Sequence, residues 1–171
     1  MTLFTSGYVA DDSRSLSTKN VGLKLTTFYV NTITDVTFSF SGSNSAVLRC
    51  YVQTSDGTIS QIGSDYSYLN TPGSHTFDAS SSPVTIDTDN FILFIYFVSG
   101  SNVDVEVQYS GSTSGIGTEV YYSPKTTTPT YGSWSASSCP GTCGVPLTMN
   151  YETGGSGGTV LLPPPVAMVN L

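Results

Sequence analysis

Apolar and polar residues alternate along much of the chain between about residues 21 and 123. The clearest stretch is residues 102–109, NVDVEVQY, in which every second residue is apolar. Residues 33–41 and 46–54 follow the same rule. A period of two places one row of side chains on each face of a strand, and a helix cannot bring those apolar residues to one face. The pattern therefore predicts half-buried β-strands.

Residues 91–98, FILFIYFV, are apolar without alternation. The stretch is short, rich in aromatic and β-branched residues, and followed by Ser-Gly, which favours a central strand over a helix. We expect both faces of this strand to be covered. One face meets the core, and the other meets a tail, a loop or a neighbouring subunit.

Turn motifs separate these stretches, among them Asp56-Gly57, which predicts a β-hairpin. The expected strands cover about residues 21–30, 33–41, 46–54, 58–62, 75–79, 83–87, 91–98, 102–109 and 118–123. Many short strands without crossover helices indicate an all-β, antiparallel two-sheet β-sandwich, with a single jelly roll as the expected form. The expected core consists of Leu23, Leu25, Phe38, Phe40, Leu48, Cys50, Val52, Leu93, Ile95, Phe97, Val103, Val105 and Val107.

The composition changes on both sides of this region. We expect residues 1–20 to form an N-terminal arm, residues 21–123 the β-sandwich domain, and residues 124–171 a Pro/Gly-rich C-terminal extension. Seven of the nine prolines lie in the last of these segments, and each proline removes a donor from a strand ladder. A Gly-Gly-Ser-Gly-Gly spacer at 154–158 then precedes an apolar end.

The apolar end is expected to be an assembly arm, because a chain end exposed to water is usually polar. It can dock on its own sandwich, on a neighbouring subunit or on a lipid surface. The residues expected to make the contact are Val160, Leu161, Leu162, Val166, Met168, Val169 and Leu171.

The charge of the chain excludes one class of partner. Twelve acidic residues oppose five basic ones, giving a formal net charge of −7. Residues 50–124 contain eight acids and no base, and such a surface repels a phosphate backbone. We therefore expect no nucleic-acid partner.

The apolar stretches are also too short to cross a membrane, which takes about 20 apolar residues in a helix. The beginning of the chain, MTLFTSGYVADDSR, has neither a basic region nor a long apolar one, so we expect no secretory signal peptide and no membrane span.

The three cysteines differ in their surroundings. Cys50 lies in an alternating stretch and is expected to be a core residue. Cys139 and Cys143 flank Pro-Gly-Thr, a turn sequence that can bring the two thiols together in a disulfide. Two free thiols or metal ligation are the alternatives. The latter is disfavoured because only Cys50 and His75 remain to complete a zinc site.

Groups that could perform catalysis or bind metal are few. His75 could act as a base with Asp78 or Asp87, but no nucleophile motif such as G-x-S-x-G accompanies it. Asp87 and Asp89, together with Asp35, could ligate calcium, although acids at a strand start are more often a solvated turn. We therefore predict no catalytic residue, no metal site and no cofactor, and hence no enzyme.

Four aromatic residues near the end of the last expected strand suggest a different kind of site. A stacking platform of this kind binds sugar rings in carbohydrate-binding sandwiches. Aromatics in such a place are equally often core lids or subunit contacts. The residues in question are Tyr121, Tyr122, Tyr131 and Trp134.

These features together describe a rigid β-body with arms and a hydroxyl-rich, weakly charged surface. Serine and threonine account for 51 of 171 residues. At the level of class it resembles the single jelly-roll subunits of virus particles and the subunits of β-built surface appendages. The leading hypothesis is a virion structural protein (capsid, penton or spike/turret subunit) that assembles with itself and with other structural subunits. The alternative is an extracellular or cell-surface carbohydrate-binding or adhesive module, with a glycan receptor as partner.

Overall fold

The computed structural model describes residues 1–42 and 44–153, and these residues form strands with one short 3-10 turn, η1 (Tyr131–Ser133). No helix in the described part of the chain is long and apolar enough to span a membrane. The strands are β1 (Thr2–Thr5), β2 (Asp12–Ser15), β3 (Asn20–Leu25), β4 (Val30–Ser41), β5 (Ser45–Thr54), β6 (Ile59–Leu69), β7 (Gly73–Asp78), β8 (Val84–Thr88), β9 (Phe91–Gly100), β10 (Asp104–Val107), β11 (Thr118–Tyr122), β12 (Ser135–Ala136) and β13 (Leu147–Glu152).

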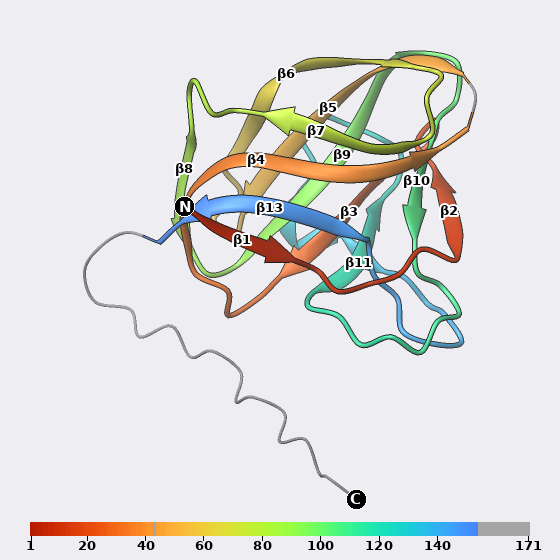
Figure 1. The fold of residues 1–171 in the computed structure, drawn as a ribbon. Coiled ribbons are helices and arrows are strands. Elements are labelled where there is room, and N and C mark those ends of the chain that lie inside the picture. The colour runs from red at the N-terminus through yellow and green to blue at the C-terminus, as the bar shows by residue number, and fades with distance from the viewer. Residues whose placement is uncertain (43, 154–171) are drawn as a thin grey trace, which may run out of the picture.

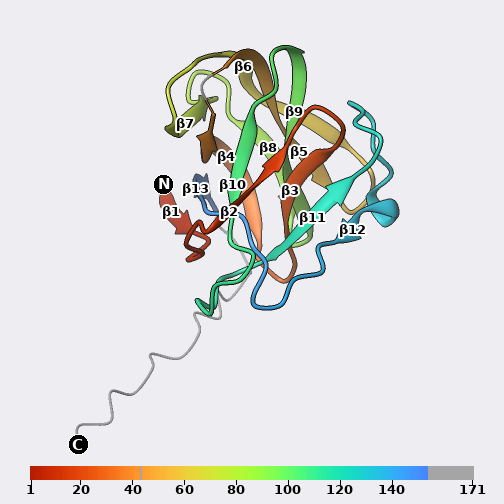
Figure 2. The ribbon, with the colours of Figure 1, turned by 90° about the vertical axis from the view of Figure 1, so that its right-hand side faces the viewer.

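The strands form two sheets in which every pairing is antiparallel (Figures 1 and 2). In the first sheet the pairing path is β1-β13-β4-β10-β2. β13 and β10 pair with the same edge of β4, at different places along it, and β7 and β8 pair with its other edge. The second has the order β12-β11-β3-β9-β5-β6. The prediction of an all-β, antiparallel, two-sheet fold is confirmed.

Strand β4 organises the first sheet, because it pairs along both edges. Its inward residues Phe38 and Phe40 are fully buried, as the alternating pattern requires. Its outward hydroxyl groups contact hydroxyl groups of β7 on the neighbouring strand. Oγ1 of Thr37 lies 2.7 Å from Oγ1 of Thr76. Cross-strand pairs of this kind each add a fraction of a kcal/mol, about 0.2–1.

One hydrophobic cluster takes residues from both sheets. All thirteen positions that the pattern assigns to the core are buried, most of them completely, and Phe97 is the most exposed at 8%. The Asp56-Gly57 hairpin is also present. It joins β5 to β6, and Gly57 adopts a φ of 95°, which glycine tolerates better than any other residue.

The second face of β9 is covered by a loop, one of the three coverings expected. Ile92 and Phe94 point away from the main core and form a second cluster with Tyr51 and Val120. The loop between β11 and β12 packs over this cluster through Tyr131 and Trp134.

The segments expected to be arms contain paired strands. Within residues 1–20, β1 pairs with β13 and β2 pairs with β10, and Phe4 and Leu16 are buried. Within residues 124–171, β13 lies between β1 and β4. These strands are only four to six residues long, too short for alternation to stand out from the sequence around them. The expected assembly-arm residues, 160–171, lie outside the described residues.

Candidate functional site

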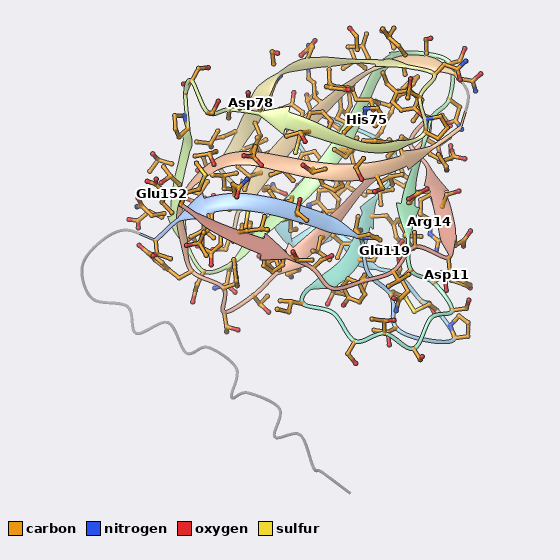
Figure 3. All side chains as sticks on the ribbon, viewed as in Figure 1. Asp11, Arg14, His75, Asp78, Glu119 and Glu152 are labelled. Atoms are coloured by element: carbon orange, nitrogen blue, oxygen red, sulfur yellow. A yellow bond between two sulfur atoms is a disulfide. The ribbon has the colours of Figure 1, made fainter. Side chains whose placement is uncertain are left out.

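A polar groove lies where the margins of the two sheets meet, between β2 of the first sheet and β11 of the second. Its volume is about 520 Å³. Figure 3 shows Arg14 and Glu119, one from each sheet, close together at this margin. The groove is lined by Asp12, Arg14, Lys19, Tyr109, Glu119, Tyr121, Ser137 and Ser138.

The strand registers explain why charged side chains point into this space. Arg14 lies opposite Val105, and Glu119 lies opposite Leu23, so each shares a face with a core residue. In the middle of a sheet that face would be buried among apolar side chains. At the margin it opens toward solvent and can hold polar groups.

Arg14 is the centre of the groove. Its Nε donates a hydrogen bond to Oε1 of Glu119 at 3.1 Å, which links the two sheets. Its Nη1 donates to Oδ2 of Asp12 at 2.6 Å, and its guanidinium lies 4.7 Å from the ring centroid of Tyr109. The hydrogen bond from Arg14, followed by that from the backbone N–H of Ser13, holds the pKa of Asp12 below its ordinary value.

Glu119 is unusual because its carboxylate is buried without full hydrogen bonding. The residue is 1% exposed, and its Oε2 has no hydrogen-bond partner within residues 1–42 and 44–153. Leaving a buried acceptor unsatisfied costs about 1–3 kcal/mol, and more for a charged group. Such an exception is a strong reason to look for a ligand or water at this place.

The two tyrosines form the walls of the groove, and each has a cation on one ring face. Arg14 lies over Tyr109, and Nζ of Lys19 lies 5.3 Å from the ring centroid of Tyr121. Two acids and two bases line the groove, so its formal charge is balanced.

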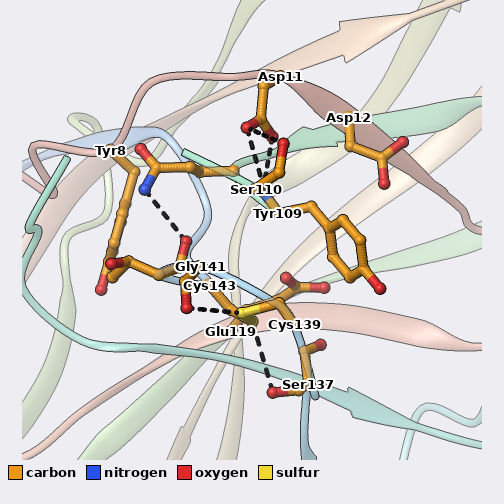
Figure 4. The surroundings of a disulfide bond; sticks show 12 residues. Tyr8, Asp11, Asp12, Tyr109, Ser110, Glu119, Ser137, Cys139, Gly141 and Cys143 are labelled. Atoms are coloured by element: carbon orange, nitrogen blue, oxygen red, sulfur yellow. Dashed lines mark hydrogen bonds between the residues drawn. A yellow bond between two sulfur atoms is a disulfide. The ribbon is translucent and has the colours of Figure 1, made fainter. Parts of the chain in front are cut away.

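The Cys139–Cys143 pair is joined in a disulfide, with the Cα atoms 6.1 Å apart. Figure 4 shows Glu119 and Ser137 in its surroundings. The N–H of Ser137 donates to the carbonyl of Glu119 at 3.0 Å, so the chain before the disulfide is fixed to β11. The disulfide therefore closes the loop that follows Ser137 and Ser138 at the groove.

Thiol counting tests this assignment. In denaturant without reductant we expect one reactive thiol, that of Cys50, and after reduction three. In the native protein Cys50 is expected to be inert, because it is fully buried and burial raises the pKa of its thiol. Three reactive thiols before reduction would rule out the disulfide.

The four aromatics proposed from sequence do not form one platform. Tyr121 lines the groove, whereas its neighbour Tyr122 points to the other face of β11, because successive residues of a strand alternate. Tyr122 contacts Trp134 at a centroid distance of 5.6 Å.

Trp134 is held over the second sheet by Gln53. Its Nε1 donates to Oε1 of Gln53 at 2.8 Å, and Nε2 of Gln53 donates to the carbonyl of Pro129 at 2.6 Å. The indole packs 5.1 Å from the ring of Phe94. Trp134 thus occupies the position of a lid on the sheet, one of the alternatives for these aromatics.

His75 uses both ring nitrogens in contacts with groups that are not acidic. Nδ1 lies 2.6 Å from the hydroxyl of Tyr66, and Nε2 lies 2.6 Å from the carbonyl of Thr71. Asp78 is three residues along the same strand and therefore on its other face.

The acids considered for calcium are engaged separately. Asp87 accepts hydrogen bonds from Tyr29 and Asn31, and Asp35 accepts from Asn150. Among the residues that the structure places, no group of three or more His, Cys, Asp or Glu side chains could hold a metal ion.

Sequence reasoning missed Arg14 and Glu119 because they are 105 residues apart and meet only through the sheet margins. The sequence contains one indication of this site. Glu119 is the only acid in a strand that otherwise carries Thr, Val and Tyr, and an acid in such a strand can have a specific partner.

Comparison with known proteins gives no further guidance: no family model, no curated protein and no solved structure matches this chain.

Proposed function

We propose that this chain is a structural, non-enzymatic subunit of a virus particle, built as a jelly-roll sandwich. The support comes first from the strand order. Four neighbouring positions of the first sheet are β2-β10-β4 followed by β7 and β8, and four of the second are β3-β9-β5-β6. The chain crosses between sheets at nearly every connection from β2 to β10. This order supports a jelly roll, an architecture used by capsid proteins, lectins and cupins.

The shared core supports face-to-face packing of the two sheets. Phe38 of β4 belongs to the same cluster as Leu23 of β3 and Leu93 of β9. A sheet with one apolar face must bury it against another layer, and the second sheet is the available layer.

The observation that carries the assembly proposal is the edge formed by β1. This strand ends its sheet, carries no charge or proline, and exposes Leu3 by 63%. Proteins usually protect sheet edges with charges, prolines or bulges, because an unprotected edge pairs with another strand. β13, the last strand described, lies beside β1.

The surface composition also suits a building block. Three lysines in 171 residues leave little side-chain entropy to lose when surface is buried. Interfaces are depleted in lysine for the same reason.

A second candidate is an extracellular or cell-surface carbohydrate-binding or adhesive module. The observation in its favour is the polar groove lined by Tyr109 and Tyr121, since jelly-roll lectin domains bind sugars.

Size-exclusion chromatography with light scattering separates the two. The full chain is expected to form oligomers. The variant Leu3→Lys is expected to approach the 18.0 kDa mass of a single full-length chain, and a chain ended after Glu152 the smaller mass of its own monomer. Val9→Lys adds the same charge at an exposed residue outside any strand and should leave assembly unchanged.

Two results would contradict the proposal that this chain assembles into a particle. If the full chain is a clean monomer at high concentration and binds glycans, it is a binding module. If both the truncated chain and Leu3→Lys assemble as well as the full chain, neither the tail nor the β1 edge connects subunits.

A further inference from the structure

We infer that the groove between β2 and β11 binds one neutral sugar unit of a glycan. This site is independent of the assembly proposal, because none of the residues that line the groove belongs to β1.

The balance of charge selects a neutral ligand. An anion entering the groove would approach Arg14 and Lys19 but would also face the carboxylates of Asp12 and Glu119. A cation would approach the two carboxylates but would also face the positive charges of Arg14 and Lys19. A polyhydroxylated neutral ligand can use all four groups, because each hydroxyl both donates and accepts hydrogen bonds.

The hydrogen-bonding capacity left in the groove matches a pair of neighbouring hydroxyls. Within the described residues, the contacts of Arg14 use Nε and Nη1 and leave Nη2 as a donor. Asp12 is 44% exposed in its side chain and offers acceptor positions beside that donor. A guanidinium next to a carboxylate therefore presents a donor and an acceptor at adjacent places, and two serines also line the groove.

The rings of Tyr109 and Tyr121 supply the apolar part of the site. Both are half-buried, so each ring is held in place while part of it remains accessible. A sugar ring has an apolar C–H side that packs on an aromatic face, and small-ligand sites combine such walls with a few placed polar groups. The volume of about 520 Å³ accommodates one sugar unit.

The unsatisfied oxygen of Glu119 also supports a ligand at this place. Oε2 lies within a groove-lining residue and has no donor from the described part of the protein. Because this oxygen is buried, one water that bridges it to a ligand hydroxyl would supply that donor and offset the cost of the unsatisfied acceptor.

Saturation-transfer-difference NMR with methyl glycosides of glucose, galactose and mannose tests the inference, with inorganic phosphate as the anionic probe. We expect at least one glycoside to bind and phosphate not to compete with it. Asp12→Asn and Tyr121→Ala are expected to weaken binding about tenfold or more, from the loss of a charged hydrogen bond or of a ring face. Tyr29→Ala removes an exposed tyrosine outside the groove and should leave binding unchanged.

Each variant is used only if its unfolding midpoint matches that of the parent chain, and Asp12→Asn keeps the shape of the side chain. No binding by any glycoside, binding that Tyr121→Ala leaves unchanged, or displacement of the glycoside by phosphate would overturn the inference. None of these results bears on self-assembly, which the light-scattering experiment measures separately.

Discussion

Replacing Phe40 with alanine is expected to lower the free energy of unfolding by about 3–5 kcal/mol, the range for a buried phenylalanine. Phe40 is fully buried on β4 and lies 5.8 Å from the ring of Tyr68 and 6.4 Å from that of Phe77. The substitution removes the ring and leaves a cavity that neighbouring strands on both edges of β4 prevent from closing.

Chemical denaturation measures the effect, with Leu69→Ala as the matched control. Leu69 is also an apolar strand residue but is 70% exposed, so its loss should change stability by less than about 0.5 kcal/mol. A loss below about 1 kcal/mol for Phe40→Ala would show that the core is not organised around β4 as described.

The second large effect concerns where the folded body ends. A chain ended after Glu152 is expected to fold, whereas a chain ended after Pro146 is expected not to. The longer chain keeps β13, which pairs with β4 along six residues and with β1 along four. The shorter chain loses that strand, its buried residues Leu147, Met149 and Tyr151, and the only partner of β1 in the sheet as described.

The dispersion of amide NMR resonances distinguishes the two chains directly. Circular dichroism and an unfolding transition close to that of the full chain are expected for the longer one. A well-folded shorter chain would mean that β13 is an accessory strand and that the body ends near residue 123, as the composition suggests. Loss of folding in the longer chain would mean that residues beyond Glu152 are part of the fold.

The strands that sequence predicts well share one property: each has a run of alternating or continuous apolar residues long enough to be distinctive. Residues 102–109 predict β10, and residues 91–98 predict β9, including the covering of its second face. The strands missed, β1, β2, β12 and β13, are short. The first three have too few apolar residues to reveal a period, and β13 alternates at Leu147, Met149 and Tyr151 but lies in a segment rich in proline and glycine. What stabilises them is pairing with longer strands, which is a property of the tertiary structure.

The groove could not be predicted, because it depends on which strands end the two sheets. Nothing in the local sequence indicates that residues near 14 and 119 come together, whereas Cys139 and Cys143 are close enough in sequence for their turn to be recognised. The aromatics illustrate the same limit. Residues at 121 and 122 are adjacent in sequence but lie on opposite faces of one strand, so proximity along the chain does not make a shared surface.

If this chain is a component of a virus particle, as we propose, it must be present in purified particles that carry its gene. Quantitative mass spectrometry would compare purified particles, cleared medium and cell envelopes from the same culture. We expect peptides from residues 1–153 in the particle fraction, in a fixed ratio to other structural proteins through successive purification steps. Their presence only in the cell envelopes or the cleared medium, with none retained by purified particles, would contradict the proposal and favour the carbohydrate-binding or adhesive module.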